Sequence, residues 1–166
     1  MRERALVVNA VFEIMHFVGA VVSGANIHFQ ADKKEVLFRR SVRNYLSSEF
    51  EKGTFKFGQR LIESSSIVFS AMSNFSGCLQ LLNVVTGSTS GNYKYTLFRS
   101  NVYFDYARSY ADKLKINKTV ALLDDTTSAY NSSSVKEIIQ LSLRTEGNIL
   151  LPWSRKNELN DLLAAS

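Results

Sequence analysis

Cysteine and histidine are scarce in this sequence of 166 residues, and their scarcity excludes several kinds of site. Cys78 is the single cysteine, so the chain cannot form an internal disulfide or a cysteine-based metal cluster. The two histidines, His16 and His28, lie far apart in the sequence and have no neighbouring ligand residues. We therefore predict no metal site and no bound cofactor. Cys78 is expected to be a buried thiol or to pair with a partner outside this chain.

Motifs of common α/β enzymes are also absent. The chain contains no G-x-G-x-x-G fingerprint, no Walker sequence and no G-x-S-x-G nucleophile elbow. Asp124 and Asp125 form a carboxylate pair after an apolar run, but nothing nearby in the sequence completes an acid–base or metal site. We predict that the chain is not an enzyme; a small α/β enzyme with an unrecognised motif is the alternative.

The net charge is positive, but the basic residues do not form a stripe. The formal charge is +5, and the hydrophobic and charged fractions, 45% and 21%, are typical of a globular protein. Glu35 and Glu49 dilute the densest basic group, which consists of Lys33, Lys34, Arg39, Arg40 and Arg43. Such a run is typical of a solvated helix face, and no nucleic-acid-binding motif accompanies it. We therefore predict no nucleic-acid partner.

The N-terminal segment has two interpretations. Arg2 and Arg4 precede an apolar run over residues 5–22 that ends in small residues, which is the outline of a secretory signal peptide. Glu13 and two other polar residues interrupt this run, and its apolar residues recur at helical spacing. We favour an amphipathic helix. No other segment approaches the length of a membrane span.

The rest of the chain alternates between helix and strand patterns. Short apolar runs predict strands at residues 25–30, 66–70, 84–85, 119–123 and 149–151. Helical spacing predicts helices at residues 34–50, 76–82, 103–114, from 134 onward, and 155–165. Ser134 and Glu137 form a capping box, and Gly147 stands where that helix should end. This alternation predicts an α/β fold, a parallel sheet with helices on both faces.

Two hydroxyl-rich loops follow predicted strands. One holds Ser76, and the other, residues 86–94, holds Ser88 and Thr89. Ligands of open parallel sheets bind at the carboxyl ends of the strands, where hydroxyls and free N–H groups suit a carboxylate or an amino acid. Together with Asp124, these residues are the predicted ligand-binding set. Ordinary turn chemistry explains the same loops equally well.

Three N-x-[ST] sequons occur near predicted turns or element edges, at Asn74, Asn117 and Asn131. Such tripeptides are acceptors for N-glycosylation in secreted proteins. We predict these three asparagines as glycosylation sites, and their number favours a secreted chain.

The segment Phe98–Asp125 resembles a known family. FRSNVYFDYARSYADKL followed by KTVALLDD is similar to the amino-terminal domains of ionotropic glutamate receptors, especially the kainate type. Phe104-Asp105-Tyr106-Ala107 and Leu123-Asp124-Asp125 carry the pattern, whereas the tryptophan of the family is absent. Residues 5–14, 65–77 and 83–90 resemble, more loosely, segments of the wider type I periplasmic-binding-like group.

This resemblance implies a type I periplasmic-binding-like fold. Residues 1–118 would form a first lobe that lacks its first strand, and residues 119–166 would begin a second lobe. The chain would be an extracellular receptor domain at the cell membrane, part of a ligand-gated cation channel, with a role in subunit assembly and modulation. Its partners would be other receptor subunits, which pair through first-lobe helices at 34–50 and 76–82. A small amino-acid-like ligand is compatible with this fold.

Two alternatives keep the fold but change the role. The first is the ligand-binding ectodomain of a metabotropic or guanylate-cyclase-type receptor. The second is a soluble solute-binding protein. In every receptor case the link to the membrane would come from parts outside this chain.

Overall fold

The computed structural model describes residues 33–75, 77–143 and 147–164. The chain divides into two compact units, Met1–Lys34 and Glu35–Ser166, and the features below belong to the second. The elements predicted at residues 5–22 and 25–30 lie outside the described residues, as does Ser76.

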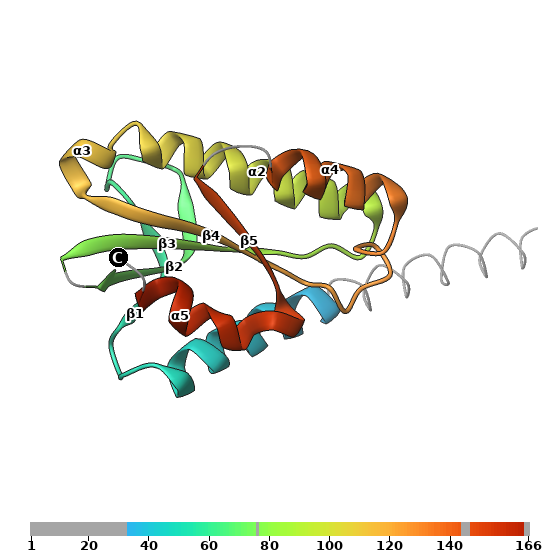
Figure 1. Ribbon diagram of the computed structural model, residues 1–166, viewed down its shortest axis with the longest axis horizontal. Coiled ribbons are helices and arrows are strands. Elements are labelled where there is room, and N and C mark those ends of the chain that lie inside the picture. The colour runs from blue at the N-terminus through green and yellow to red at the C-terminus, as the bar shows by residue number, and fades with distance from the viewer. Residues whose placement is uncertain (1–32, 76, 144–146, 165–166) are drawn as a thin grey trace, which may run out of the picture. The chain divides into compact units, whose positions relative to one another are not determined.

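A five-stranded mixed sheet forms the centre of this unit (Figure 1). Its strands lie side by side in chain order: β1 (Phe55–Arg60), β2 (Val68–Phe75), β3 (Cys78–Val85), β4 (Ile116–Leu123) and β5 (Asn148–Pro152). β2 is antiparallel to both of its neighbours, β1 and β3, whereas β3, β4 and β5 run parallel. The predicted α/β class is confirmed, but the prediction of a parallel sheet is wrong for β2, which runs against the other four strands.

A tight turn makes β2 and β3 a hairpin, so the helix predicted at residues 76–82 is wrong. Phe75 pairs with Cys78, which leaves two residues for the turn, and Gly77 has a φ of 81°. A two-residue hairpin turn needs positive φ, which glycine adopts without steric penalty. Leu81 and Leu82 are fully buried and point to opposite faces of the sheet. They are therefore not exposed helix residues available for subunit pairing.

Helices cover both faces of the sheet, as predicted (Figure 1). α2 (Ser90–Arg108) and α4 (Ser133–Leu143) pack on one face, and the helix at 33–49 and α5 (Leu159–Ala164) pack on the other. The short helices α3 (Ala111–Leu114) and η1 (Trp153–Glu158) lead into β4 and α5. Within the described residues, no helix is both long and apolar enough to cross a membrane.

Most predicted elements on the C-terminal side are confirmed in type, with shifted ends. α4 begins at Ser133, one residue before the predicted start, and β5 contains the predicted strand at 149–151. α2 begins at Ser90, so the predicted polar loop at 86–94 is shorter than expected and the predicted helix at 103–114 is longer. No element was expected at residues 55–60, where β1 forms the sheet edge.

The core has one apolar layer on each face of the sheet. On one face, the helix at 33–49 contributes Phe38, Val42 and Leu46, which pack against Leu82, Val84, Val120, Leu122 and Leu159. On the other, α2 contributes Tyr93, Leu97, Phe104 and Ala107, which pack against Leu81, Val85, Ala121 and Leu123. Because successive residues of β3 and β4 enter different layers, β4 ends in a continuous apolar run at residues 120–123, and β3 has apolar pairs at residues 81–82 and 84–85.

The boundary predicted between residues 118 and 119 falls inside β4. Lys118 and Thr119 are aligned with consecutive residues of β3, Gln80 and Leu81. The residues assigned to a first and a second lobe therefore share one sheet.

Candidate functional site

The ladder between β2 and β3 stops at the pair Ala71–Leu82, and side chains bridge the strands beyond it. Asn83 Oδ1 accepts a hydrogen bond from the Ser70 N–H at 3.2 Å. The Ser70 hydroxyl accepts one from the Val84 N–H at 3.0 Å. A side chain inserted between two backbones holds them further apart than a direct ladder bond does, so the sheet opens here.

A pocket of about 240 Å³ lies at this opening. Its polar lining comes from the helix at 33–49 (Arg39), from the sheet (Ser70, Asn83), and from α2 (Thr96, Arg99, Ser100, Tyr103). The four α2 residues have the spacing i, i+3, i+4, i+7, which places them on one face of the helix. Gly58, Val68, Phe69 and Val84 complete the wall.

Two arginines line this pocket without a carboxylate partner. Arg39 and Arg99 are both partly buried, and neither forms an ion pair with the described residues. Burial and then the positive charge of Arg99 lower the pKa of Arg39, and the attraction of Glu35 partly opposes them. The Glu35 carboxylate itself accepts a hydrogen bond from the Ser88 N–H at 2.8 Å. Because guanidinium groups stay protonated in proteins, the pocket carries two positive charges.

Asn83 and Ser100 add buried hydrogen-bonding groups to the wall, with 6% and 3% of their surface exposed. The bond from the Ser70 N–H to Asn83 Oδ1 orients Asn83 Nδ2 as a donor. Neither Asn83 Nδ2 nor Ser100 Oγ has a hydrogen-bond partner among the described residues. Both atoms are fully buried behind the pocket wall, and leaving such a group unpaired costs about 1–3 kcal/mol.

Aromatic rings hold the Arg99 side chain. Its guanidinium carbon lies 5.7 Å from the ring centroid of Tyr95 and 5.9 Å from that of Tyr103. Tyr103 packs in turn against Phe69, with 6.2 Å between ring centroids. Cation–π contacts restrict a guanidinium without using its N–H donors, so Arg99 is positioned and still able to bind.

The sequence-predicted ligand residues lie elsewhere and bind within the fold. Thr89 is the N-cap of α2, where its Oγ1 accepts a hydrogen bond from the Asn92 N–H at 3.2 Å. Asp124 is 2% exposed, and its Oδ2 accepts a hydrogen bond from Thr86 Oγ1 at 2.8 Å. The N–H of Ser88 donates to the glutamate described above. None of these three residues lines the pocket.

The loop between β3 and α2 is shaped by the start of the helix. A Cβ atom at Gly87 would lie 2.4 Å from the backbone nitrogen of Tyr93, so no side chain fits there. Thr89 supplies the capping oxygen that the first turn of a helix requires. The beginning of α2 therefore accounts for the glycine and hydroxyl content of this loop.

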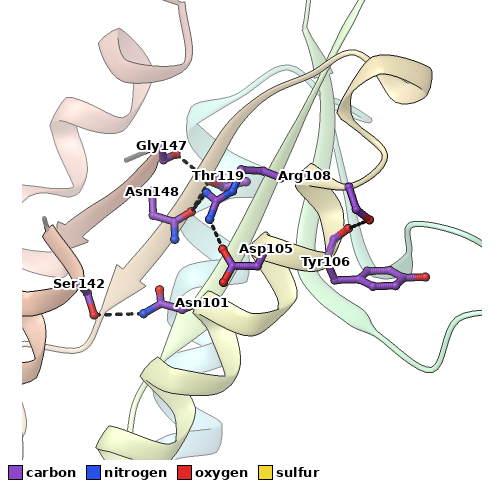
Figure 2. A network of polar contacts seen from close by, with 9 residues as sticks. Asn101, Asp105, Tyr106, Arg108, Thr119, Ser142, Gly147 and Asn148 are labelled. Atoms are coloured by element: carbon purple, nitrogen blue, oxygen red, sulfur yellow. Dashed lines mark hydrogen bonds and ion pairs between the residues drawn. The ribbon is translucent and has the colours of Figure 1, made fainter. Parts of the chain in front are cut away.

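A second polar cluster fastens α2 to the sheet near the other end of the helix (Figure 2). Arg108 Nη1 donates to Asn148 Oδ1 at 2.7 Å, and Thr119 Oγ1 lies 2.8 Å from the same oxygen. Arg108 also pairs with Asp105, one turn earlier on α2. Unlike Arg39, this arginine has a carboxylate partner and links α2 to β5. We assign this cluster to the stability of the fold.

The three sequon asparagines have exposed side chains. Asn74 lies near the end of β2, Asn117 near the start of β4, and Asn131 in the segment before α4. Their exposure is compatible with modification. Within the described residues, no group of three or more His, Cys, Asp and Glu side chains could hold a metal ion.

Sequence reasoning missed the pocket because its residues come from distant segments. The face formed by Thr96, Arg99, Ser100 and Tyr103 has a legible spacing, and it is the one signal that could have been found. The approach of Arg39 to this face depends on how the helix at 33–49 packs. Comparison with known protein families, curated proteins and solved structures finds no match to this chain.

Proposed function

We propose that this chain is a non-enzymatic binding domain that recognises an anionic group in the pocket of Arg39 and Arg99. The observation that carries the proposal is the pair of guanidinium groups, which face one pocket without an ion-pair partner among the described residues. Planar guanidinium donors match the oxygens of carboxylates and phosphates. The Ser70 hydroxyl, whose oxygen accepts the Val84 N–H, is a further donor in the same wall.

The composition of the pocket favours binding over catalysis. The described residues that line it include no carboxylate, histidine, cysteine or lysine, so no general base stands beside Ser70. The Ser70 oxygen already accepts the Val84 N–H. An anion could thus be held there, but no group is in place to activate a nucleophile.

A receptor ectodomain is a second candidate for the setting in which this domain acts. The resemblance of Phe98–Asp125 to kainate-type amino-terminal domains supports it, and the three exposed sequons are compatible with it. The reversed strand β2 does not favour it, because the type I periplasmic-binding-like lobe implied a parallel sheet. Surface labelling of cells that produce the natural full-length protein tests this candidate; a protein confined to the cell interior would refute it.

Calorimetric titration of the full chain with small anions tests the binding proposal. The variants Arg39→Gln and Arg99→Gln each remove one charge from the pocket, and Arg40→Gln removes an exposed charge from the same helix as a matched control. A hydrogen bond to a charged group is worth about 1.5–3 kcal/mol, so each pocket variant should weaken binding by roughly 10- to 100-fold. The control should bind like the wild type. Absence of binding to any carboxylate or phosphate, or equal losses in all three variants, would refute the proposal.

A further inference from the structure

We infer that the pocket prefers a phosphate monoester carried by a small molecule over a carboxylate and over a phosphodiester. This inference rests on the proposed function and names the ligand class of the same pocket. It follows from the number of charges in the pocket and from the directions of its donors.

The charge of the pocket matches a dianion. Arg39 and Arg99 bring two positive charges, and the described lining residues bring no negative one. Glu35 also acts on Arg39, but it does not line the pocket, and its attraction is smaller than the repulsion by Arg99. A carboxylate or a phosphodiester carries one negative charge and would leave one of the two arginines uncompensated. A phosphate monoester carries about 1.5 to 2 negative charges at pH 7 and compensates both.

The donors surround the pocket instead of lying in one plane. Arg39 comes from the helix at 33–49, the Ser70 hydroxyl from β2, and Arg99 from α2. A carboxylate presents two oxygens in a plane, whereas a phosphate monoester presents three strong acceptor oxygens in a tetrahedral arrangement. Donors on three separate elements therefore fit the tetrahedral group better.

A larger pocket beside β1 lacks these features. It measures about 350 Å³ and is lined by Lys56 and Arg60, both exposed, and by Ser73. Ser73 is its buried polar residue, and its hydroxyl donates to Gln80 Oε1 at 2.9 Å. Two partly buried arginines line the pocket of Arg39 and Arg99, whereas the basic residues of the pocket beside β1 are exposed.

The titratable groups around the pocket make its pH dependence simple to interpret. Arg39, Arg99 and Tyr103 line it, and Glu35 lies near Arg39. None of these is a histidine, and both histidines of the chain lie outside the described residues. The second pKa of a phosphate monoester is about 6, so between pH 5 and 7.5 the ligand changes its charge.

The experiment compares anions of different charge and shape on the full chain, by calorimetry at constant ionic strength and at pH 5, 6, 7 and 7.5. Phenyl phosphate and glycerol phosphate are the monoesters, and they distinguish an aromatic from an aliphatic carrier. Sulfate is a tetrahedral dianion at every pH, dimethyl phosphate is the diester, and benzoate is the carboxylate. Arg39→Gln and Arg99→Gln are the pocket variants, and Arg40→Gln is the control. Circular dichroism checks that each variant is folded.

At pH 7.5 at least one monoester should bind roughly tenfold or more tightly than benzoate and dimethyl phosphate. Its affinity should fall about tenfold towards pH 5, because the dianion fraction falls by that factor for a pKa of about 6. Sulfate affinity should stay constant over the same range. The arginine variants should reduce the preference for the monoester.

Benzoate or dimethyl phosphate binding as tightly as both monoesters would overturn the inference while anion binding stands. A monoester affinity that does not change between pH 5 and 7.5 would overturn it in the same way. If no anion binds at any pH, the proposed function fails together with the ligand class.

Discussion

Replacement of Arg39 by glutamine should stabilise the free protein while it weakens anion binding. Arg39 is partly buried beside Arg99, and both its burial and that charge lower its pKa, which means that the folded state disfavours the charged form. At an effective dielectric constant of about 20, two unit charges about 4 Å apart repel by roughly 4 kcal/mol, and the repulsion falls as their separation grows. Solvent screening and the lost attraction to Glu35 reduce this gain. We expect a net increase of about 0.5–1 kcal/mol in the free energy of unfolding.

Thermal unfolding followed by circular dichroism measures this effect. A gain of about 1 kcal/mol corresponds to a rise of roughly 2–4 °C in Tm for a chain of this size. The rise should shrink as salt is added, because salt screens the repulsion between the two arginines. Arg40→Gln, at an exposed position of the same helix, should change Tm by less than the pocket variant does.

Bound ligand should reverse the order of stability between the wild type and Arg39→Gln. A ligand at 100 times its Kd stabilises a protein by about 2.7 kcal/mol, so phenyl phosphate should raise the Tm of the wild type above that of Arg39→Gln. If Arg39→Gln lowers Tm without ligand at every salt concentration, then Arg39 stabilises the fold. In that case the fold would not hold two repelling arginines together for a ligand.

Three further predictions concern the fold and its surface. Leu81→Ala, at a fully buried position in β3, should lower the free energy of unfolding in urea by about 2–5 kcal/mol. Leu141→Ala, at a position 55% exposed, should lower it by about 0.5 kcal/mol or less. Equal losses in the two variants would contradict the placement of β3 in the core. Burial, followed by the charge of Asp124, raises the pKa of Tyr93 well above its usual value, so the associated stability is complete below pH 10 and is lost as pH rises beyond it. Tyr93→Phe should therefore lose less stability between pH 9 and 11 than the wild type, and an identical alkaline profile would rule out this coupling. When the chain is expressed through a secretory pathway, glycans should increase its mass, and endoglycosidase should remove this increase. Single substitutions of Asn74, Asn117 or Asn131 by glutamine should each reduce the added mass by one step. A secreted chain of unmodified mass would refute these sites.

Local periodicity accounts for the elements that sequence reasoning placed correctly. In the helix at 33–49, Phe38, Val42 and Leu46 recur every four residues, and all three are buried on one face. α4 begins at Ser133, one residue before its predicted start. These features depend on neighbours within one or two turns of the chain, so they are legible without tertiary structure.

The same local patterns were ambiguous for β3. Cys78, Leu79, Leu81 and Leu82 fit a short helix as well as a strand, because a brief apolar run satisfies both periods. What decides is the apolar layer on each face of the sheet, since only a strand sends Leu81 and Leu82 into opposite layers. The antiparallel direction of β2 has a related cause, because the two-residue turn after Phe75 leaves no room for a crossover.

By itself, the sequence determined the α/β class, the positions of most helices and the short apolar strands. It also determined the excess of positive charge, but not where that charge converges. Only the tertiary structure brings Arg39 beside Arg99, because their encounter requires two helices from opposite faces of the sheet to meet where β2 and β3 separate. That separation in turn depends on Asn83 and Ser70 replacing ladder bonds with their side chains. No local pattern encodes such a meeting, since it arises from strand order and packing between segments about 60 residues apart.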